Sequence, residues 1–231
     1  MKLLNLIPVL ISTLCFLFSQ TLYADSYRKD LPDANDNTGW DLVLEKNGAQ
    51  IYTMDWEGSN YVALKAVQMI HSPLSNIVGN FTDASTYPEW ANDLEESFVV
   101  EPFDESRSRK VYTRLGMPWP TSDRDVVFGQ KFIQDPKTKT FRIKEWYEGN
   151  VLPEKKGVVR TLSLNIEFVF IPVSEDLTMM VWQGHNEPGG SLPPFIINWL
   201  VKDVFYSSAI NLRERLETPA YNKAADWFVD F

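Results

Sequence analysis

The residues capable of covalent or metal chemistry are few and scattered. The 231-residue chain contains two histidines, His71 and His185, and one cysteine, Cys15. Neither histidine has a neighbour at the short spacing that zinc ligands require. The chain has no nucleophile elbow and no phosphate-binding glycine loop, and Gly189 and Gly190 precede two prolines, which indicates a turn. We therefore predict no catalytic residue, no metal and no cofactor.

Polar residues on apolar strand faces are the more informative signal. Side chains alternate between the two faces of a strand. By this alternation Arg160 shares a face with Leu162 and Leu164, Gln130 falls among Arg124, Val126, Phe128 and Phe132, and Glu145 falls among Phe141, Ile143 and Tyr147. A buried charge must be paired, reach the end of the sheet, or line a space that holds water or a ligand head group.

Two interpretations of these residues remain open. In one, they sit at strand ends, or a bulge resets the alternation. In the other, Gln130 and one of the inward charged groups supply the few polar contacts of a mostly apolar pocket, which would orient a lipid by one or two hydrogen bonds.

The elements that would position these residues are strands followed by one long helix. A helix is predicted from about Pro193 to Leu216, with both prolines in its first turn. Its broad apolar stripe includes Leu200, Val204, Phe205 and Ser208, and this stripe either packs flat on a sheet or roofs a cavity.

Upstream of this helix, alternation and turn residues predict mainly strands. IYTMDW and YVALKAVQMI form a hairpin through residues 57–60, and residues 72–92 form a short helix pair. Six further runs of strand type follow, which are SFVVEPF, RKVYTRL, RDVVFGQKFI, FRIKEWYE, VVRTLSLNIEFVFI and LTMMVWQGH. We expect a short helix over residues 39–46. Successive strands with short connections favour an antiparallel sheet, and hence an α+β fold.

The N-terminus follows the pattern of a secretory signal. Lys2 precedes an apolar run to Phe18, and a small residue stands at Ala24. We predict cleavage near Ala24, while a lipoprotein acceptor at Cys15 and an uncleaved anchor remain alternatives. The expected organisation is a signal peptide over 1–24, a flexible leader over 25–38, one domain over 39–217 and a tail over 218–231. The net charge of −9 argues against a nucleic-acid partner.

Four segments in order resemble START (StAR-related lipid transfer) domains. They are TYPEW, GMPWPTSDRDVVF, LPEKKGVVR and PGGSLPPFIINWLV running on to INLRERL, and the resemblance extends from about Trp40 to Leu216. It implies the helix-grip fold, in which a curved antiparallel sheet wraps around the long C-terminal helix and encloses a cavity for one lipid. It also implies a non-enzymatic protein that carries or senses lipid.

Residues that bind the head group in other START domains are replaced here. Tyr87 and Ala91 stand where the family's phosphatidylcholine carriers have an arginine and an aspartate. Gln130 stands where sterol-type members have a basic residue, whose acidic partner would fall near Val111 or Tyr112. The resemblance therefore implies a weakly polar ligand, such as a sterol or an acyl lipid. The expected lipid-binding residues are Tyr112, Phe128, Gln130, Tyr147, Arg160, Trp182, Leu200, Val204, Phe205 and Ser208.

The function expected from the sequence is that of a monomeric, periplasmic or secreted lipid carrier that contacts membranes transiently. Two alternatives remain open. One is a helix-grip enzyme, of cyclase or hydrolase type, which would need a carboxyl group with a raised pKa deep in the cavity. The other is a ligand sensor that binds lipid without moving it between membranes.

Overall fold

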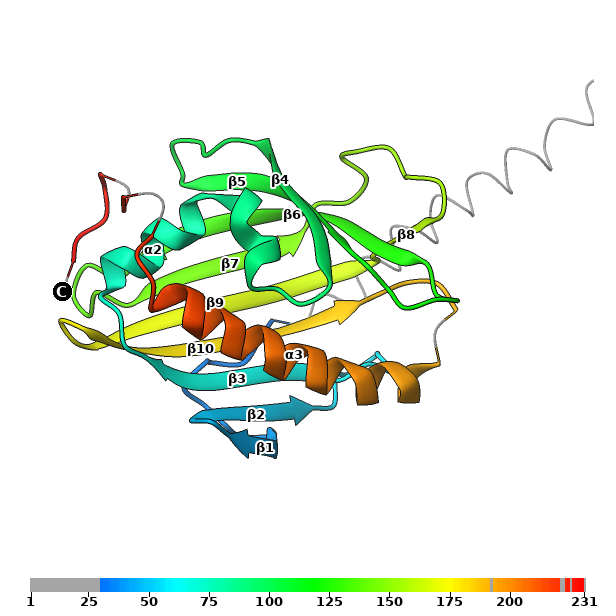
Figure 1. The fold of residues 1–231 in the computed structure, drawn as a ribbon, viewed down its shortest axis with the longest axis horizontal. Helices are drawn as coiled ribbons and strands as arrows, with labels where there is room; N and C mark the ends of the chain where they lie inside the picture. Colours follow the sequence, from blue (N-terminus) through cyan, green and yellow to red (C-terminus); the bar gives the residue numbers. More distant parts are fainter. Residues whose placement is uncertain (1–29, 192, 221–222, 225, 231) are drawn as a thin grey trace, which may run out of the picture.

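The computed structural model describes residues 30–191, 193–220, 223–224 and 226–230. The predicted signal peptide, residues 1–24, lies outside them. Within the described residues, ten strands form one sheet in the order β1-β2-β3-β10-β9-β7-β6-β5-β4, with β8 added against β6. Neighbours on the main path pair antiparallel, and β8 pairs parallel with β6. The predicted helix-grip architecture is confirmed (Figure 1).

The elements follow one another with short connections. The strands are β1 (Asp41–Lys46), β2 (Ala49–Met54), β3 (Ala63–Ile70), β4 (Leu94–Glu101), β5 (Ser108–Leu115), β6 (Asp123–Gln134), β7 (Phe141–Tyr147), β8 (Val158–Arg160), β9 (Ser163–Ser174) and β10 (Leu177–Glu187). The helices are α2 (Leu74–Thr82), the 3₁₀ helix η1 (Ala84–Glu89) and α3 (Pro194–Leu216).

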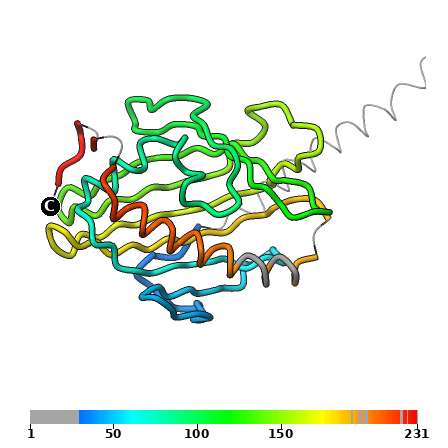
Figure 2. Tube along the Cα trace, in the orientation of Figure 1, coloured from blue at the N-terminus to red at the C-terminus, as the bar shows by residue number. Residues whose placement is uncertain are grey.

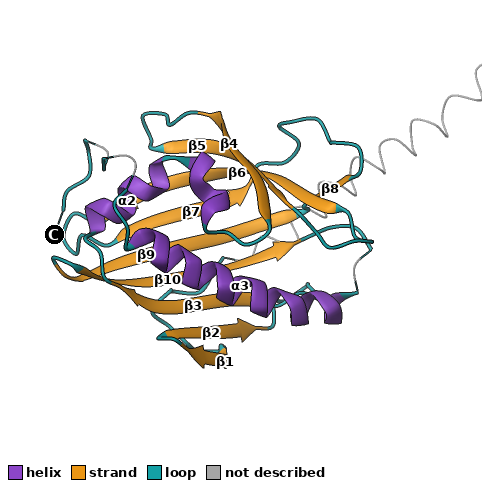
Figure 3. Cartoon of the chain, in the orientation of Figure 1, coloured by secondary structure: helices purple, strands orange, loops and turns teal. Residues whose placement is uncertain are grey.

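The three helices cover one face of the sheet, which we call the inner face (Figures 1 and 3). The main core lies there, where α2, η1 and the C-terminal part of α3 pack on apolar residues of the strands. Leu212 and Leu216 of α3 are completely buried in this core. At the α3 N-terminus, Pro194 occupies the first turn, where its missing N–H costs no hydrogen bond.

The helix expected over residues 39–46 is wrong, because this segment forms strand β1. Its partner is β2, and the turn between the two strands contains Asn47 at φ 52° and Gly48 at φ 72°. Asn-Gly is the dipeptide that favours a two-residue hairpin turn with both residues at positive φ. The apolar spacing of Trp40, Val43 and Leu44 therefore imitates a helical period over too few residues to outweigh this turn.

Residues 25–38 were expected to form a flexible leader. The described part of this segment packs on the face of the sheet opposite the helices, which we call the outer face. Ala34 is buried against Val169 and Val181. Lys65, itself fully buried, donates through Nζ to the carbonyl oxygen of Asp36 at 2.7 Å. Gln183 donates to the carbonyl oxygen of Pro32 at 2.7 Å. The described residues 30–38 thus form a strap, because their carbonyl groups satisfy polar side chains that project from the outer face.

The C-terminal tail also packs on the domain. Trp227 and Phe228 lie against the main core, with the ring centres of Phe228 and Phe141 6.1 Å apart. The backbone of Val229 exchanges two hydrogen bonds with the side chain of Gln134, at 3.0 and 2.7 Å. The chain trace brings the tail to the end of the sheet where α2 begins (Figure 2). The tail therefore closes that end of the core.

Candidate functional site

A cavity of about 240 Å³ lies on the inner face, between the sheet, α3 and the loop that joins β5 to β6. Most of its wall is apolar, and the apolar lining residues are Val62, Leu64, Leu115, Met117, Pro118, Ile166, Trp182, Pro188, Val204 and Phe205. The polar lining residues are Tyr61, Asp93, Arg124, His185, Asn186 and Asn198. A concave apolar site with a few polar groups is the usual form of a small-molecule site.

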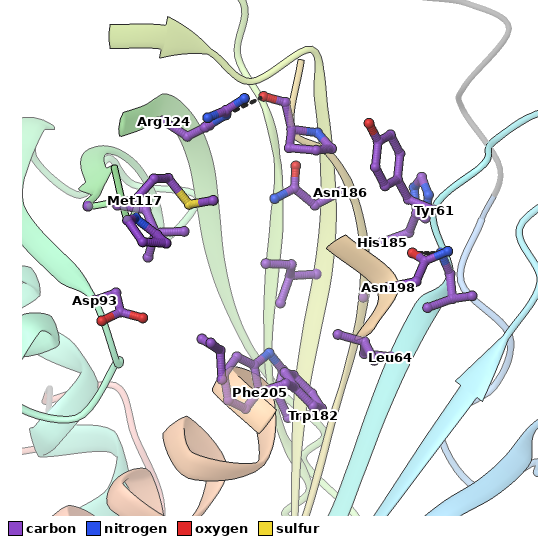
Figure 4. A pocket seen from close by; sticks show the side chains of 18 residues that line it. Tyr61, Leu64, Asp93, Met117, Arg124, Trp182, His185, Asn186, Asn198 and Phe205 are labelled. Atoms are coloured by element: carbon purple, nitrogen blue, oxygen red, sulfur yellow. Dashed lines mark hydrogen bonds between the residues drawn. The ribbon is translucent and has the colours of Figure 1, made fainter. Parts of the chain in front are cut away.

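Several polar lining residues gather at one end of the cavity, and two large aromatic residues lie at the other (Figure 4). Arg124, Asn186 and Tyr61 lie towards one end in this view, whereas Trp182 and Phe205 lie together at the other. The rings of Trp182 and Phe205 have centres 4.5 Å apart, which joins β10 to α3 at the apolar end. A ligand with one polar end and one apolar end would match this arrangement.

His185, on β10, belongs to the cavity wall but is itself buried. Its ring stacks on Trp56, with 4.7 Å between ring centres and 7° between ring planes. Burial lowers the pKa of His185 to about 4, so the imidazole is neutral at pH 7. At that pH the histidine therefore adds no positive charge to the cavity.

A second polar group is buried on the inner face near α2, where it does not line the cavity. Gln130 is its centre: its Oε1 accepts from Arg109 Nε at 2.7 Å, and its Nε2 donates to Glu145 Oε1 at 2.6 Å. Arg109 also donates to the Tyr87 hydroxyl at 2.9 Å and to the Phe81 carbonyl at 2.8 Å. We call Tyr87, Arg109, Gln130 and Glu145 the buried polar network.

The network holds a carboxyl group that burial makes difficult to ionise. Glu145 is 6% exposed, and burial raises its pKa to about 7. The hydrogen bond from Gln130 and the positive charge of Arg109 lower this pKa, but burial has the larger effect. Burial also raises the pKa of Tyr87. A carboxyl group with a pKa near 7 can exchange a proton at neutral pH, which is the property that an acid–base catalyst needs.

The structure brings three of the expected lipid-binding residues to the cavity, namely Trp182, Val204 and Phe205. Phe128 belongs to the neighbouring core and Tyr147 packs against it, while Gln130 lies in the buried polar network. Ser208 does not line the cavity. Its Oγ accepts a hydrogen bond from the backbone N–H of Asn92 at 3.0 Å. The side chain of Leu200 lies outside the described part of the chain.

Arg160 and Tyr112 lie on the outer face, so the assignment of Arg160 to the face of Leu164 is wrong. Both bond to Asp125, which follows cavity-lining Arg124 on β6 and so points to the opposite side of the sheet. Arg160 Nε donates to Asp125 Oδ1 at 2.7 Å, and Tyr112 donates to Oδ2 at 3.2 Å. The alternation breaks at residues 161–162, because β8 pairs with β6 whereas β9 pairs with β7 and β10.

Sequence reasoning missed Arg109, Tyr87 and most of the polar lining residues. Arg109 has the same parity as the buried core residue Val111, so alternation along β5 was a usable signal. At the positions where sterol-type family members have a basic and an acidic residue, this sequence has no charged pair. The fold nevertheless places a basic residue, Arg109, and an acidic residue, Glu145, on the two sides of Gln130. Tyr61, Asn186 and Asn198 come from separate segments, and no pattern along the chain connects them.

Among the described residues, no helix has the length and apolar character to cross a membrane. The same residues contain no cluster of three or more His, Cys, Asp or Glu side chains suited to hold a metal ion.

Comparison with known proteins places the chain in a family. A family-level match to the START domain spans residues 33–220, which is most of the chain. This chain belongs to the START domain family. The match starts within the strap and ends just beyond α3, so the family domain includes part of the leader that was expected to lie outside it.

Individual relatives of this START domain are distant but match over about four fifths of the chain. An uncharacterized protein of Pseudomonas aeruginosa is 27% identical over 77% of this chain and 87% of its own length. The phosphatidylcholine transfer protein of Bos taurus is 21% identical over 80% of this chain and 88% of its own. A crystal structure of a StAR-related lipid transfer protein from Xanthomonas axonopodis shares the fold, with a TM-score of 0.71, 23% identity, and coverage of 78% of this chain and 99% of that one.

Proposed function

We propose that this START domain binds one lipid molecule in the cavity beneath α3 and carries it between membranes outside the cytoplasm. The observation that carries the proposal is the predominantly apolar cavity, which the fold encloses between sheet and helix. The phosphatidylcholine transfer proteins among its relatives support the same class of ligand. The signal-like residues 1–24 support a location outside the cytoplasm.

The size of the cavity bears on how a lipid would enter. Pockets for drug-sized molecules measure about 300–1,000 Å³, whereas this one measures about 240 Å³. A bulky ligand would therefore need the wall to move apart. The N-terminal end of α3 and the β5–β6 loop are suited to such a movement, because both line the cavity and neither belongs to the main core.

Exposed aromatic side chains flank the same part of the molecule. Trp119 in the β5–β6 loop is 92% exposed, and Phe195 in the first turn of α3 is 75% exposed. Their neighbours Pro118 and Asn198 line the cavity. Tryptophan and phenylalanine side chains insert readily into the interface of a bilayer. We infer that this end of the protein contacts the membrane while the ligand enters or leaves.

The test is native mass spectrometry of the protein purified from its own host, followed by extraction and identification of the lipid. The variant Val204→Trp, which places an indole in the cavity wall, should abolish ligand binding. The matched control Asp203→Trp puts the same side chain on an exposed position of α3 and should retain it. An empty wild-type protein that also binds no sterol, fatty acid or phospholipid would refute the proposal.

Transfer and sensing are separated by a second measurement. Movement of a fluorescent lipid from donor to acceptor vesicles, accelerated by the loaded protein, supports a carrier. Stable binding without any acceleration of transfer would instead support a sensor.

An enzyme remains a second candidate because of Glu145, whose pKa near 7 suits acid–base work. The side chain does not line the cavity, and its Oε1 already accepts from Gln130, which favours the carrier. Incubation of the protein with the compound that it retains, followed by mass spectrometry, decides between them. Conversion by the wild type but not by Glu145→Gln would establish the enzyme.

A further inference from the structure

Arg124 holds a buried positive charge at the cavity. The side chain is 6% exposed and lines the cavity from β6. Its guanidinium donates to three backbone carbonyl oxygens, those of Pro188 at 3.4 Å, Gly189 at 3.3 Å and Ser122. Among the described residues it forms no ion pair with a carboxylate. Carbonyl dipoles satisfy some of its N–H groups, and the negative charge of Asp123 acts on the guanidinium only from beyond ion-pair distance.

Two arginines on neighbouring strands differ from Arg124 in having carboxylate partners. Arg160, equally buried, has the carboxylate of Asp125 at 2.7 Å. Arg114, on β5, is paired with Asp123 at 2.7 Å and with Glu96 at 3.3 Å. Burying a charge without a partner lowers the stability of the folded protein. Arginine cannot avoid this cost by losing its proton, because its guanidinium stays charged in proteins. Within the described part of the chain, buried Arg109 also has no ion pair, but it hydrogen-bonds Gln130 and Tyr87 and does not line the cavity. Of these four arginines Arg124 alone lines the cavity, so its charge is the one available to a ligand.

The turn after β10 is built closely around the guanidinium. Gly189 and Gly190 adopt φ of 68° and 72°, a region that favours glycine. A Cβ at Gly190 would lie 3.2 Å from Arg124 Nη2, and one at Gly189 would lie 2.8 Å from the Arg160 carbonyl oxygen. The absence of a side chain at Gly190 therefore lets the backbone approach Arg124, whose Nη2 donates to the Gly189 carbonyl oxygen at 3.3 Å.

The neighbouring cavity residues suit a polar ligand end at this position. Asn186, an exposed residue on β10, lies at the same end of the cavity as Arg124, and Trp182 lies at the opposite end (Figure 4). Asp93 carries the opposing charge on the wall, but it is exposed, so solvent screens its effect on a bound anion.

We propose that Arg124 binds the anionic head group of a single-chain lipid, whose tail extends towards Trp182 and Phe205. This inference rests on the proposed function and specifies its ligand as an amphiphile with a carboxylate or a phosphate. A guanidinium matches both groups, since its N–H donors form paired hydrogen bonds with two oxygens of either anion. The cavity of about 240 Å³ suits one chain better than two.

The competing role for Arg124 is purely structural: it would clamp the turn after β10 to the residues before β6. A clamp needs the hydrogen bonds to the three carbonyl groups, but it has no need of a ligand's charge. The two roles therefore differ in whether binding depends on the ionic state of the ligand.

The experiment compares three probes with the same C16 chain by displacement of a fluorescent fatty acid: hexadecanoate, hexadecyl phosphate and hexadecanol. Wild-type protein should bind at least one of the two anions about ten- to a hundredfold more tightly than the alcohol, as expected for a hydrogen bond to a charged group. The preferred anion identifies the head group as a carboxylate or a phosphate. Arg124→Gln should remove the preference while retaining affinity for hexadecanol.

The matched control is Arg114→Gln, which removes the same charge from a neighbouring strand where carboxylates neutralise it; it should keep the preference. Near-ultraviolet circular dichroism verifies that each variant is folded. If Arg124→Gln does not fold, two measurements on the wild-type protein still test the proposal. They are the ratio of its affinities for the anions and for the alcohol, and the pH titration of the carboxyl resonance of bound [1-¹³C]hexadecanoate. Arg124 should lower the pKa of that carboxyl group below its value in solution.

Equal affinity for all three probes, or an unchanged preference in Arg124→Gln, would overturn the assignment of Arg124 and leave the lipid-carrier proposal standing. Failure of all three probes and of the wider lipid panel would remove both proposals.

Discussion

Replacing Glu145 by glutamine should abolish a fall in stability that the wild-type protein shows between about pH 4.5 and pH 7. Glu145 lies on the inner face of β7 and belongs to the buried polar network, in which its Oε1 accepts from Gln130. Glutamine has almost the same shape, and its Oε1 can accept the same hydrogen bond. The substitution therefore removes the ability to ionise while keeping the packing.

The magnitude follows from the pKa values of the folded and unfolded states. Burial raises the pKa of Glu145 from 4.5 to about 7, so the folded protein retains this proton more strongly than the unfolded chain. Its contribution to stability is fully present below pH 4.5 and is lost as the pH rises through 7. At about 1.4 kcal/mol per pH unit, the loss amounts to about 3 kcal/mol.

The assay is urea unfolding of the wild type and Glu145→Gln at a series of pH values from 4 to 8.5. The free energy of unfolding of the variant relative to the wild type should rise by about 3 kcal/mol across this range. A difference in the free energy of unfolding that is the same at every pH reflects the additional amide hydrogens of glutamine. The test is therefore the change of this difference with pH. Glu105→Gln, at an exposed loop position, is the matched control and should leave the slope unchanged.

A pH-independent difference would refute this reasoning. It would mean that Glu145 is ionised in the folded protein at pH 5 and that the positive charge of Arg109 outweighs the cost of burial. The network would then be an ion pair bridged by Gln130, not a neutral acid beside a cation.

Three further perturbations address other parts of the molecule. Asp125→Ala leaves Arg160 buried without its carboxylate and should lower the free energy of unfolding by about 3–5 kcal/mol, measured by urea titration. Ala34→Glu places a charge beneath the strap and should lower thermal stability, whereas Asn35→Glu, at an exposed position, should leave the melting temperature unchanged. Trp119→Ala should slow lipid transfer between vesicles several-fold with little effect on lipid affinity, because the side chain is 92% exposed; equal transfer rates would exclude a role in membrane contact.

Alternation along the strands predicted the environment of some polar residues and not of others. Gln130 and Glu145 lie in the middle of long strands, where each face is defined by many residues, and both project inwards as expected. Arg160 ends a strand of three residues, and a two-residue break separates it from β9. Alternation along the sequence does not predict the face of a residue across such a break, because β8 pairs with β6 whereas β9 pairs with β7 and β10.

Local sequence determined most elements of this protein. Period-two patterns placed the strands of the sheet from β2 onwards, although β8 and β9 were expected as one run, and two prolines followed by a broad apolar stripe placed α3. These signals are local because a strand or a helix needs a matching pattern only over its own length. The Asn47–Gly48 turn was an equally local signal for β1, and it outweighed a short helical spacing.

Tertiary structure alone decided how the polar groups are paired. Arg124, Arg160 and Arg109 stand on neighbouring strands of one sheet, yet one lines the cavity and donates to backbone carbonyl groups, one bonds Asp125 on the outer face, and one enters the buried polar network. Their partners are brought near by strand order and by turns distant along the chain. The energy of a buried charge depends on what surrounds it in space, so the sequence predicts that such a charge needs a partner, and the fold determines which partner it has.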